Sequence, residues 1–131
     1  MIEDPDNVRW PSLTMEDALA GVGKGWTTIL LPLVNFCLAH NIQILQVKEK
    51  FGGLRFYTAR AHDQETADTL DKMCREAEEA AEKTCEFCGA PGHPREGGWI
   101  KTLCNACDAK REQDYIAAAV RAARHFTRGD E

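Results

Sequence analysis

Long apolar runs and an export signal are missing from this sequence. No run approaches the ~18 consecutive apolar residues that a membrane-spanning helix needs. The first residues, MIEDPDNVRWP, are acidic and lack the basic start and apolar stretch of a signal peptide. We therefore expect no membrane partner and a cytoplasmic location. In that reducing compartment, paired cysteines indicate metal binding or catalysis before they indicate disulfides.

Catalytic motifs are missing as well. The four histidines, at positions 40, 62, 93 and 125, show no metal-ligand spacing. There is no nucleophile elbow, phosphate-binding loop or His-Glu-x-x-His motif. We therefore predict that the protein is not an enzyme, and catalysis supported by a metal is a distant alternative.

The basic excess of a protein that coats nucleic acid is also missing, because the formal net charge is −5. Positive charge is local: residues 21–60 carry a net +4, whereas residues 61–84 carry a net −5. Any binding of nucleic acid must therefore depend on a local patch.

The 131 residues that are present suffice for one domain with a core, since chains of this size bury roughly 65–70% of their unfolded surface. We expect a single domain over residues 1–131. Its first part, residues 1–84, should hold helices and a hairpin, and its second part, residues 85–131, should hold a metal-binding segment and a C-terminal helix.

Three stretches of the first part have helical spacing. PSLTMEDALAGVG predicts a short helix with Ser12 or Thr14 as its N-cap. GWTTILLPLVNFCLAHN predicts a second helix, in which Pro32 should cause a kink or mark the first turn. HDQETADTLDKMCREAEEAAEKT predicts a third helix with acids around an apolar stripe. Cys37 and Cys74 lie on these apolar stripes, so we interpret them as packed residues.

Between the second and third helices, IQILQVKEKFGGLRFYTAR changes to an alternating pattern. Gly52 and Gly53 predict a hairpin with a two-residue turn, because glycine accepts the positive φ that such turns require. This register places Lys50 opposite Arg55. One face then carries Val47, Phe51, Leu54 and Phe56, and the other carries Lys48, Lys50, Arg55 and Tyr57.

The basic face of this hairpin needs an anion, since like charges opposite each other across strands are destabilising. Either the acidic helix lies beside the hairpin, or a partner supplies the negative charge. In the second case Lys48, Lys50 and Arg55 offer phosphate contacts and Tyr57 a stacking ring. We expect such nucleic-acid binding to be weak, salt-sensitive and without sequence preference.

The second part of the chain holds four of the six cysteines, Cys85, Cys88, Cys104 and Cys107, in the spacing C-x2-C-x15-C-x2-C. This spacing predicts a Zn²⁺ site with four thiolate ligands. GGWIKTL should form the second arm of a small hairpin that leads to Cys104, and CNAC should begin a helix, as in treble-clef fingers. Four protein ligands close the site to substrate, so its role should be structural. Two redox-active Cys-x-x-Cys pairs are the alternative, but no βαβ pattern supports them.

Two resemblances accompany these motifs. LCNAC and the preceding Trp99 resemble the GATA-type zinc finger, a treble clef that binds DNA. The match covers residues 85–110, and Asp108, Glu112 and Asp114 depart from that family's basic tail.

The broader resemblance runs from GKGWTTILLPL through QVKEKFGGLRFY to CEFCGAPG and LCNAC. This order is similar to small, uncharacterised zinc-binding proteins of phages and prophages. The resemblance implies a bacterial host cell as the location, and a host regulator or defence complex as a partner. It implies no activity.

The last helix-forming stretch, KREQDYIAAAVRAARHFTRG, places Ile116 and Val120 on one face. We expect this face to contact another molecule, either a host protein or a second copy in a homodimer. The alternative is that the helix packs back on the hairpin, with Phe126 as its anchor.

Together these patterns predict an α+β fold: helices against a small β-hairpin, an acidic helix, and a C-terminal treble-clef-like zinc finger with four cysteine ligands. The patterns predict non-enzymatic binding of a macromolecule, and the resemblance to phage proteins implies that this is a host protein, with the chain as a regulator or an anti-defence inhibitor comparable to an anti-CRISPR. Nucleic-acid binding is the alternative.

Overall fold

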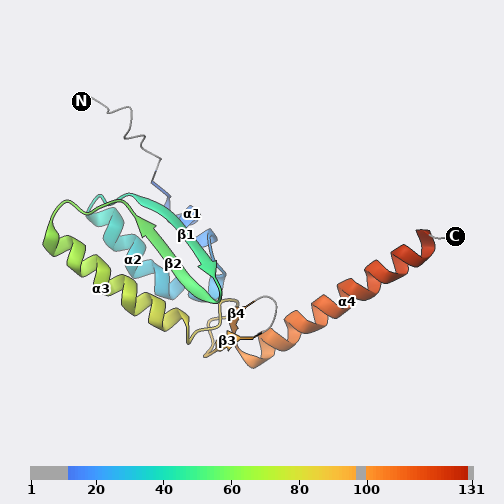
Figure 1. The fold of residues 1–131 in the computed structure, drawn as a ribbon. Helices are drawn as coiled ribbons and strands as arrows, with labels where there is room; N and C mark the ends of the chain where they lie inside the picture. Colours follow the sequence, from blue (N-terminus) through green and yellow to red (C-terminus); the bar gives the residue numbers. More distant parts are fainter. Residues whose placement is uncertain (1–11, 97–99, 130–131) are drawn as a thin grey trace.

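The computed structural model describes residues 12–96 and 100–129, with side chains up to residue 124, and confirms the predicted α+β class (Figure 1). The elements are α1 (Met15–Ala20), the 3₁₀ turn η1 (Lys24–Trp26), α2 (Thr27–Ala39), β1 (Ile44–Lys50), β2 (Gly53–Thr58), α3 (Gln64–Ala81), β3 (His93–Arg95), β4 (Lys101–Leu103) and α4 (Asn105–Gly129). The segment MIEDPDNVRWP, Trp99 and the side chain of Phe126 lie outside the described residues. None of the helices in the described ranges combines the length and apolar character that crossing a membrane requires.

The first two helices follow the sequence pattern closely. Thr14 caps α1, where its Oγ1 accepts the N–H of Asp17 at 3.1 Å. Ser12, the other candidate cap, instead accepts the N–H of Ile44 at 3.1 Å and so ties the chain to the start of β1. Pro32 is the sixth residue of α2, so the prediction that it marks the first turn is wrong.

The turn of the β1–β2 hairpin lies one residue earlier than predicted. Phe51 and Gly52 form it, with φ angles of 55° and 82°, and Lys50 pairs with Gly53. A two-residue hairpin turn of this type needs positive φ at both central positions. Gly52 is held there because Thr102 Oγ1 donates to its carbonyl at 2.6 Å. The predicted turn at Gly52 and Gly53 is therefore wrong, and Lys48, not Lys50, faces Arg55.

The two faces of the hairpin nevertheless divide nearly as predicted. Val47, Leu54 and Phe56 are buried on the inner face. Phe51 is an exception, because its place in the turn leaves its side chain 69% exposed. The outer face carries Lys48, Lys50, Arg55 and Tyr57, and we call these four residues the basic face.

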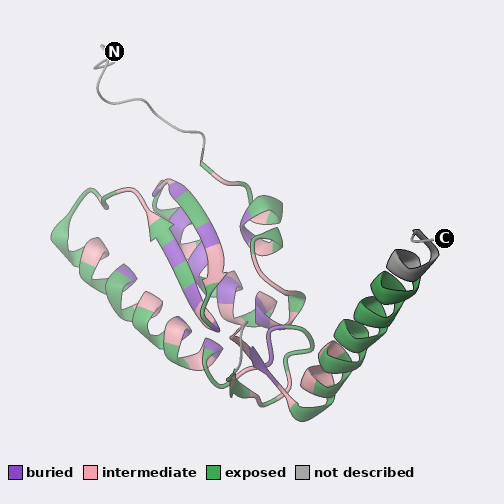
Figure 2. Ribbon diagram, turned by 45° about the vertical axis from the view of Figure 1, so that its right-hand side comes forward, coloured by how far each residue is buried: buried purple, intermediate pink, exposed green. Residues whose placement is uncertain are grey.

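Helices α2 and α3 pack against the inner face of the hairpin and form the core with it (Figures 1 and 2). The buried members of α3 are Leu70, Ala77 and Ala81, which join the same cluster as Leu54 and Phe56. The core also contains Ala18, Trp26, Leu30, Leu33, Val34, Cys37, Ile42, Ile44 and Val47. The acidic helix therefore covers the apolar face of the hairpin, and its Glu78, with Glu82 just after the helix, lies beside Lys50 and Arg55 at the turn end of the basic face.

Helix α4 projects away from the rest of the molecule (Figure 1). Every residue from 112 to 124 is exposed, as the continuous green of this helix shows in Figure 2. Over the described side chains, the alternative in which α4 packs back on the hairpin is wrong.

Candidate metal centre

The first cysteine pair lies in a tight loop after α3. The N–H of Cys85 donates to the carbonyl of Ala90 at 2.7 Å, and the N–H of Gly89 donates to the carbonyl of Cys85 at 2.9 Å. Gly89 has a φ of 84°, a left-handed conformation that favours glycine. These bonds fold the loop so that the thiols of Cys85 and Cys88 lie within 4.8 Å of each other.

The second pair comes from the junction of β4 and α4. Strand β4 pairs with β3 and ends at Leu103, so it leads directly to Cys104, as predicted. Cys104 precedes the first residue of α4, and its Sγ accepts the N–H of Cys107 at 3.4 Å. Its carbonyl accepts the N–H of Asp108 at 3.0 Å. The thiol therefore occupies the position of a helix N-cap, where the helix dipole favours negative charge.

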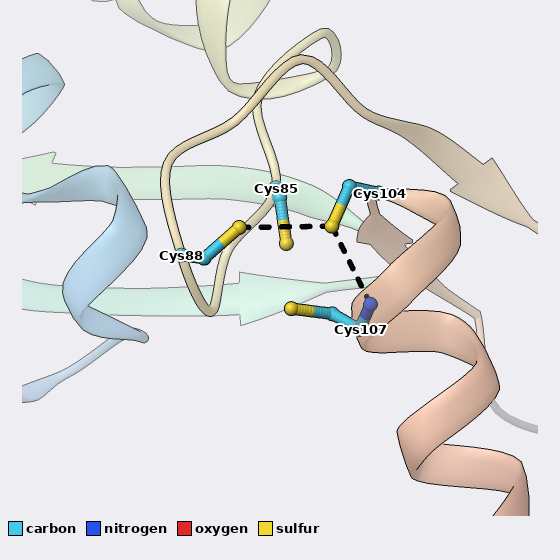
Figure 3. A group of neighbouring side chains, drawn as sticks. All are labelled: Cys85, Cys88, Cys104 and Cys107. Atoms are coloured by element: carbon cyan, nitrogen blue, oxygen red, sulfur yellow. Dashed lines mark hydrogen bonds between the residues drawn. The ribbon is translucent and has the colours of Figure 1, made fainter.

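The four thiols converge on one point (Figure 3). All four Sγ atoms lie within 4.8 Å of one another, and those of Cys88 and Cys104 are 3.6 Å apart. A tetrahedron with Zn–S bonds of ~2.3 Å has edges of about 3.8 Å. The structure thus brings the four predicted ligands together in a group that can hold a metal ion. His93 is exposed on β3 and is not part of this group.

Two thiols of the cluster, those of Cys85 and Cys107, have pKa values shifted in opposite directions. Burial acts to raise the pKa of Cys85, but backbone N–H groups of Cys104, Cys88 and Phe87 donate to its sulfur and lower the pKa to about 6. Burial, together with hydrogen bonds to the neighbouring thiols, raises the pKa of Cys107 to about 12. At neutral pH these shifts favour ionisation of Cys85 over Cys107, and binding of a divalent metal by four thiolates requires loss of the Cys107 proton.

Glu86, between the first two cysteines, fastens the loop to the N-terminal part of the chain. Its side chain is almost fully buried, and its Oε2 accepts the N–H of Gly23 at 2.9 Å. Its Oε1 lies 3.3 Å from Lys101 Nζ, which also lies 3.2 Å from Glu49 Oε1. Its carbonyl accepts the N–H of Gly25 at 2.7 Å. Glu86 thus connects η1 with β4, and Lys101 extends this connection to Glu49 of β1.

The Gly-x-Gly-Trp motif, residues 23–26 of the stretch GKGWTTILLPL, holds the cysteine loop from the N-terminal side. A Cβ on Gly25 would lie 2.6 Å from the Glu86 carbonyl oxygen and from the Gly89 nitrogen, and closer still to the carbonyl oxygen of Cys85. The next residue, Trp26, donates its indole N–H to the carbonyl of Thr84 at 2.8 Å. The absence of a side chain at position 25 is therefore what lets the cysteine loop approach. The motif was visible in the sequence, but its role in holding the loop was not predicted.

A groove of about 450 Å³ lies beside the cluster, and Cys88 and Cys107 line it. Its other lining residues are Lys24, Phe87, Lys101, Lys110, Arg111 and Asp114. Four thiolates and one divalent cation carry a net charge of about −2. The cationic side chains that line this groove would offset part of that charge.

The remaining predicted site residues lie away from the cluster. Lys48, Lys50, Arg55 and Tyr57 share the outer face of the hairpin. Ile116 and Val120 lie on α4 and are 54% and 44% exposed.

No family model, curated protein or solved structure matches the chain.

Proposed function

We propose that Cys85, Cys88, Cys104 and Cys107 bind one zinc ion and that this ion is structural. The support is the donor set, since four cysteine sulfurs at tetrahedral separation fill every position around zinc and leave none for a substrate. The ion joins the loop after α3 to the first turn of α4. The ion stabilises this segment in place of a hydrophobic core, since strands β3 and β4 have only three residues each.

Metal analysis of the purified protein tests this assignment. We expect about one equivalent of zinc per chain and a lower melting temperature after treatment with a chelator. A tetrahedral set of four sulfurs also suits iron, so the same analysis must include it. Less than half an equivalent of zinc, or a melting curve that is indifferent to the chelator, contradicts the proposal.

We further propose that the protein is a non-enzymatic binding protein whose helix α4 engages a protein partner. The observation that carries this proposal is the exposure of α4, on which Ile116 and Val120 form an apolar face with no described side chain of the same molecule against it. Helices normally gain most of their stability from packing one amphipathic face. An exposed face of this kind fits a groove in another protein.

The first turn of α4 is fixed in position by contacts with Arg95. Arg95 donates to the carbonyl of Leu103 at 3.0 Å and to Asn105 Oδ1 at 2.7 Å, and it lies 3.8 Å from Asp108 Oδ2. These contacts and the zinc fix the first turn of the helix. The resemblance to phage and prophage proteins suggests a host regulator or a defence complex as the partner, with inhibition as the outcome.

A paired set of variants tests the helix face. We expect Ile116→Glu with Val120→Glu to abolish capture of a partner from nuclease-treated bacterial lysate, with zinc content and melting temperature unchanged. Ala118→Glu with Ala122→Glu is the matched control, since it adds the same charges at the same spacing on the opposite side of α4 and should retain capture. Equal capture by both variants contradicts the proposal. A doubled mass in light scattering, lost only in the first variant, would identify the partner as a second copy.

A further inference from the structure

We propose that the basic face of the β1–β2 hairpin binds single-stranded nucleic acid. This site is separate from α4 and from the cysteine cluster, so it stands or falls independently of the function proposed above.

No ion pair among the described residues involves a cation of the basic face. Lys48 lies directly opposite Arg55, an arrangement that is unfavourable for two like charges. The ion pairs among the described residues use other cations, namely Lys72, Arg95, Lys101 and Arg111. The acidic helix α3 packs against the opposite, apolar face. An anion from outside would therefore relieve the repulsion between Lys48 and Arg55.

Exposed aromatic rings lie next to these cations. Tyr57 is 45% exposed, and Lys48 Nζ lies 5.7 Å from the centre of its ring. Phe51, exposed at the hairpin turn, has Lys50 Nζ at 5.6 Å from its ring centre. Stacking on such rings requires unpaired bases, and the neighbouring ammonium groups suit the phosphates. This combination favours a single strand over a duplex, whose bases are already paired and stacked. It also favours a single strand over an acidic peptide, which has no bases.

Two carboxylates limit the affinity at the turn end of the face. Glu78 and Glu82 line a hollow of about 130 Å³ together with Lys50 and Arg55. Their negative charge repels a phosphate at this end of the face, although neither carboxylate forms an ion pair with Lys50 or Arg55. We therefore expect Glu78→Gln with Glu82→Gln to tighten binding, a change that no purely structural role of the basic face would produce.

Fluorescence anisotropy with labelled oligothymidine and oligouridine of about 20 nucleotides measures the binding and distinguishes DNA from RNA. Three phosphate contacts predict a slope near −2 for the logarithm of affinity against the logarithm of salt concentration. Raising the salt from about 50 to about 200 mM should thus weaken binding by about 20-fold. The full-length, zinc-loaded protein is used throughout.

Variants assign the binding to the face. Lys48→Ala with Lys50→Ala and Arg55→Ala should weaken binding by about tenfold or more and flatten the salt dependence. Tyr57→Ala should weaken it by about fivefold or more through loss of stacking. The matched control, Lys72→Ala with Arg75→Ala and Lys83→Ala, removes the same charge from exposed positions of α3 and the residues that follow it, and should bind within about threefold of the unmodified protein. Melting temperature and zinc content show that each variant is folded.

Three results overturn the proposal: no binding at about 50 mM salt, equal losses in the two triple variants, or binding of polyglutamate or duplex DNA as tight as that of the single strands. Selective, salt-dependent binding that is lost with the three basic-face cations supports it.

Discussion

Gly25 lies directly against the backbone of the cysteine loop. A methyl group at this position would meet the carbonyl oxygens of Cys85 and Glu86 and the nitrogen of Gly89. All three atoms belong to the backbone of the loop that holds the first two thiols. Backbone atoms cannot swing aside as the end of a side chain can, so any added bulk must move the loop.

We expect Gly25→Ala to lower the free energy of unfolding of the zinc-loaded protein by about 1–3 kcal/mol, the usual cost of overpacking. Gly53→Ala is the control, because its Cβ would meet only the Lys50 carbonyl oxygen, at 3.5 Å. Urea denaturation followed by circular dichroism measures both. Equal stability of the two variants would show that the loop adjusts freely.

Cys37 and Cys74 differ chemically from the four clustered thiols. Burial raises the pKa of each to about 11, from an ordinary value of 9.0. A raised pKa lowers the thiolate fraction and with it the reactivity. These two residues are therefore packed groups, in agreement with the interpretation from the sequence.

We expect a chelator to unfold the cysteine segment, so that its four thiols become accessible to a disulfide reagent at neutral pH, while Cys37 and Cys74 react only after denaturation of the whole protein. Because the unfolded thiols ionise near pH 9 and the folded ones near pH 11, their stabilising contribution is complete below pH 9 and is lost as the pH rises to about 11. A Cys37→Ala, Cys74→Ala variant should lack this part of the pH dependence. An identical decline in both proteins would contradict the assignment.

Among the elements, the periodic ones were predictable and the contacts between them were not. The positions of α2 and α3 follow from apolar spacing, and the cap of α1 was narrowed to Ser12 or Thr14, because these signals are local. The cysteine spacing likewise predicted which four side chains meet. The turn at Phe51 and Gly52 was missed because the neighbouring Gly53 suits the same geometry. The choice depends on Thr102, which lies 50 residues further along the chain.

The two short strands and the first turn of α4 have little apolar core of their own, so we expect them to depend on the metal. Cys104→Ser should reduce zinc content and unfold the segment from Cys85 to Arg111, since structural zinc contributes on the order of 10 kcal/mol to such modules. Hydrogen exchange measured by mass spectrometry locates the loss. Cys74→Ser, which alters a thiol outside the cluster, should keep full zinc. A Cys104→Ser protein with full zinc and normal protection would rule out the cluster as the metal site.

At the level of the whole molecule, the N-terminal part and the cysteine segment are held together by polar contacts. Glu86 and Lys101 meet Gly23 and Glu49 across a buried interface. Nothing in the local sequence distinguishes Glu86 from the chain's many other acidic residues, so its role required the three-dimensional structure. The expected single domain over residues 1–131 stays a prediction, and these contacts are the reason to maintain it.

The exposed part of α4 is not among the contacts that hold the N-terminal part and the cysteine segment together, so its removal should leave the rest of the fold intact. We expect a chain that ends after Gln113 to keep its zinc and to melt within about 2 °C of the full-length protein, because every residue from 114 to 124 is exposed. Differential scanning calorimetry measures the change. A large drop in melting temperature would show that α4 stabilises the fold and is not reserved for a partner.

The bond from the Trp26 indole to the Thr84 carbonyl spans 58 residues, and this separation has a consequence for synthesis in the cell. A ribosome adds about 5–20 residues per second, so Thr84 is synthesised about 3–12 s after Trp26, and the hydrogen bond cannot form before then. During that interval the nascent helices and hairpin expose the surface that the cysteine segment later covers. We therefore expect metal insertion to be a late event of biosynthesis, delayed until the last of the four thiols has left the ribosome.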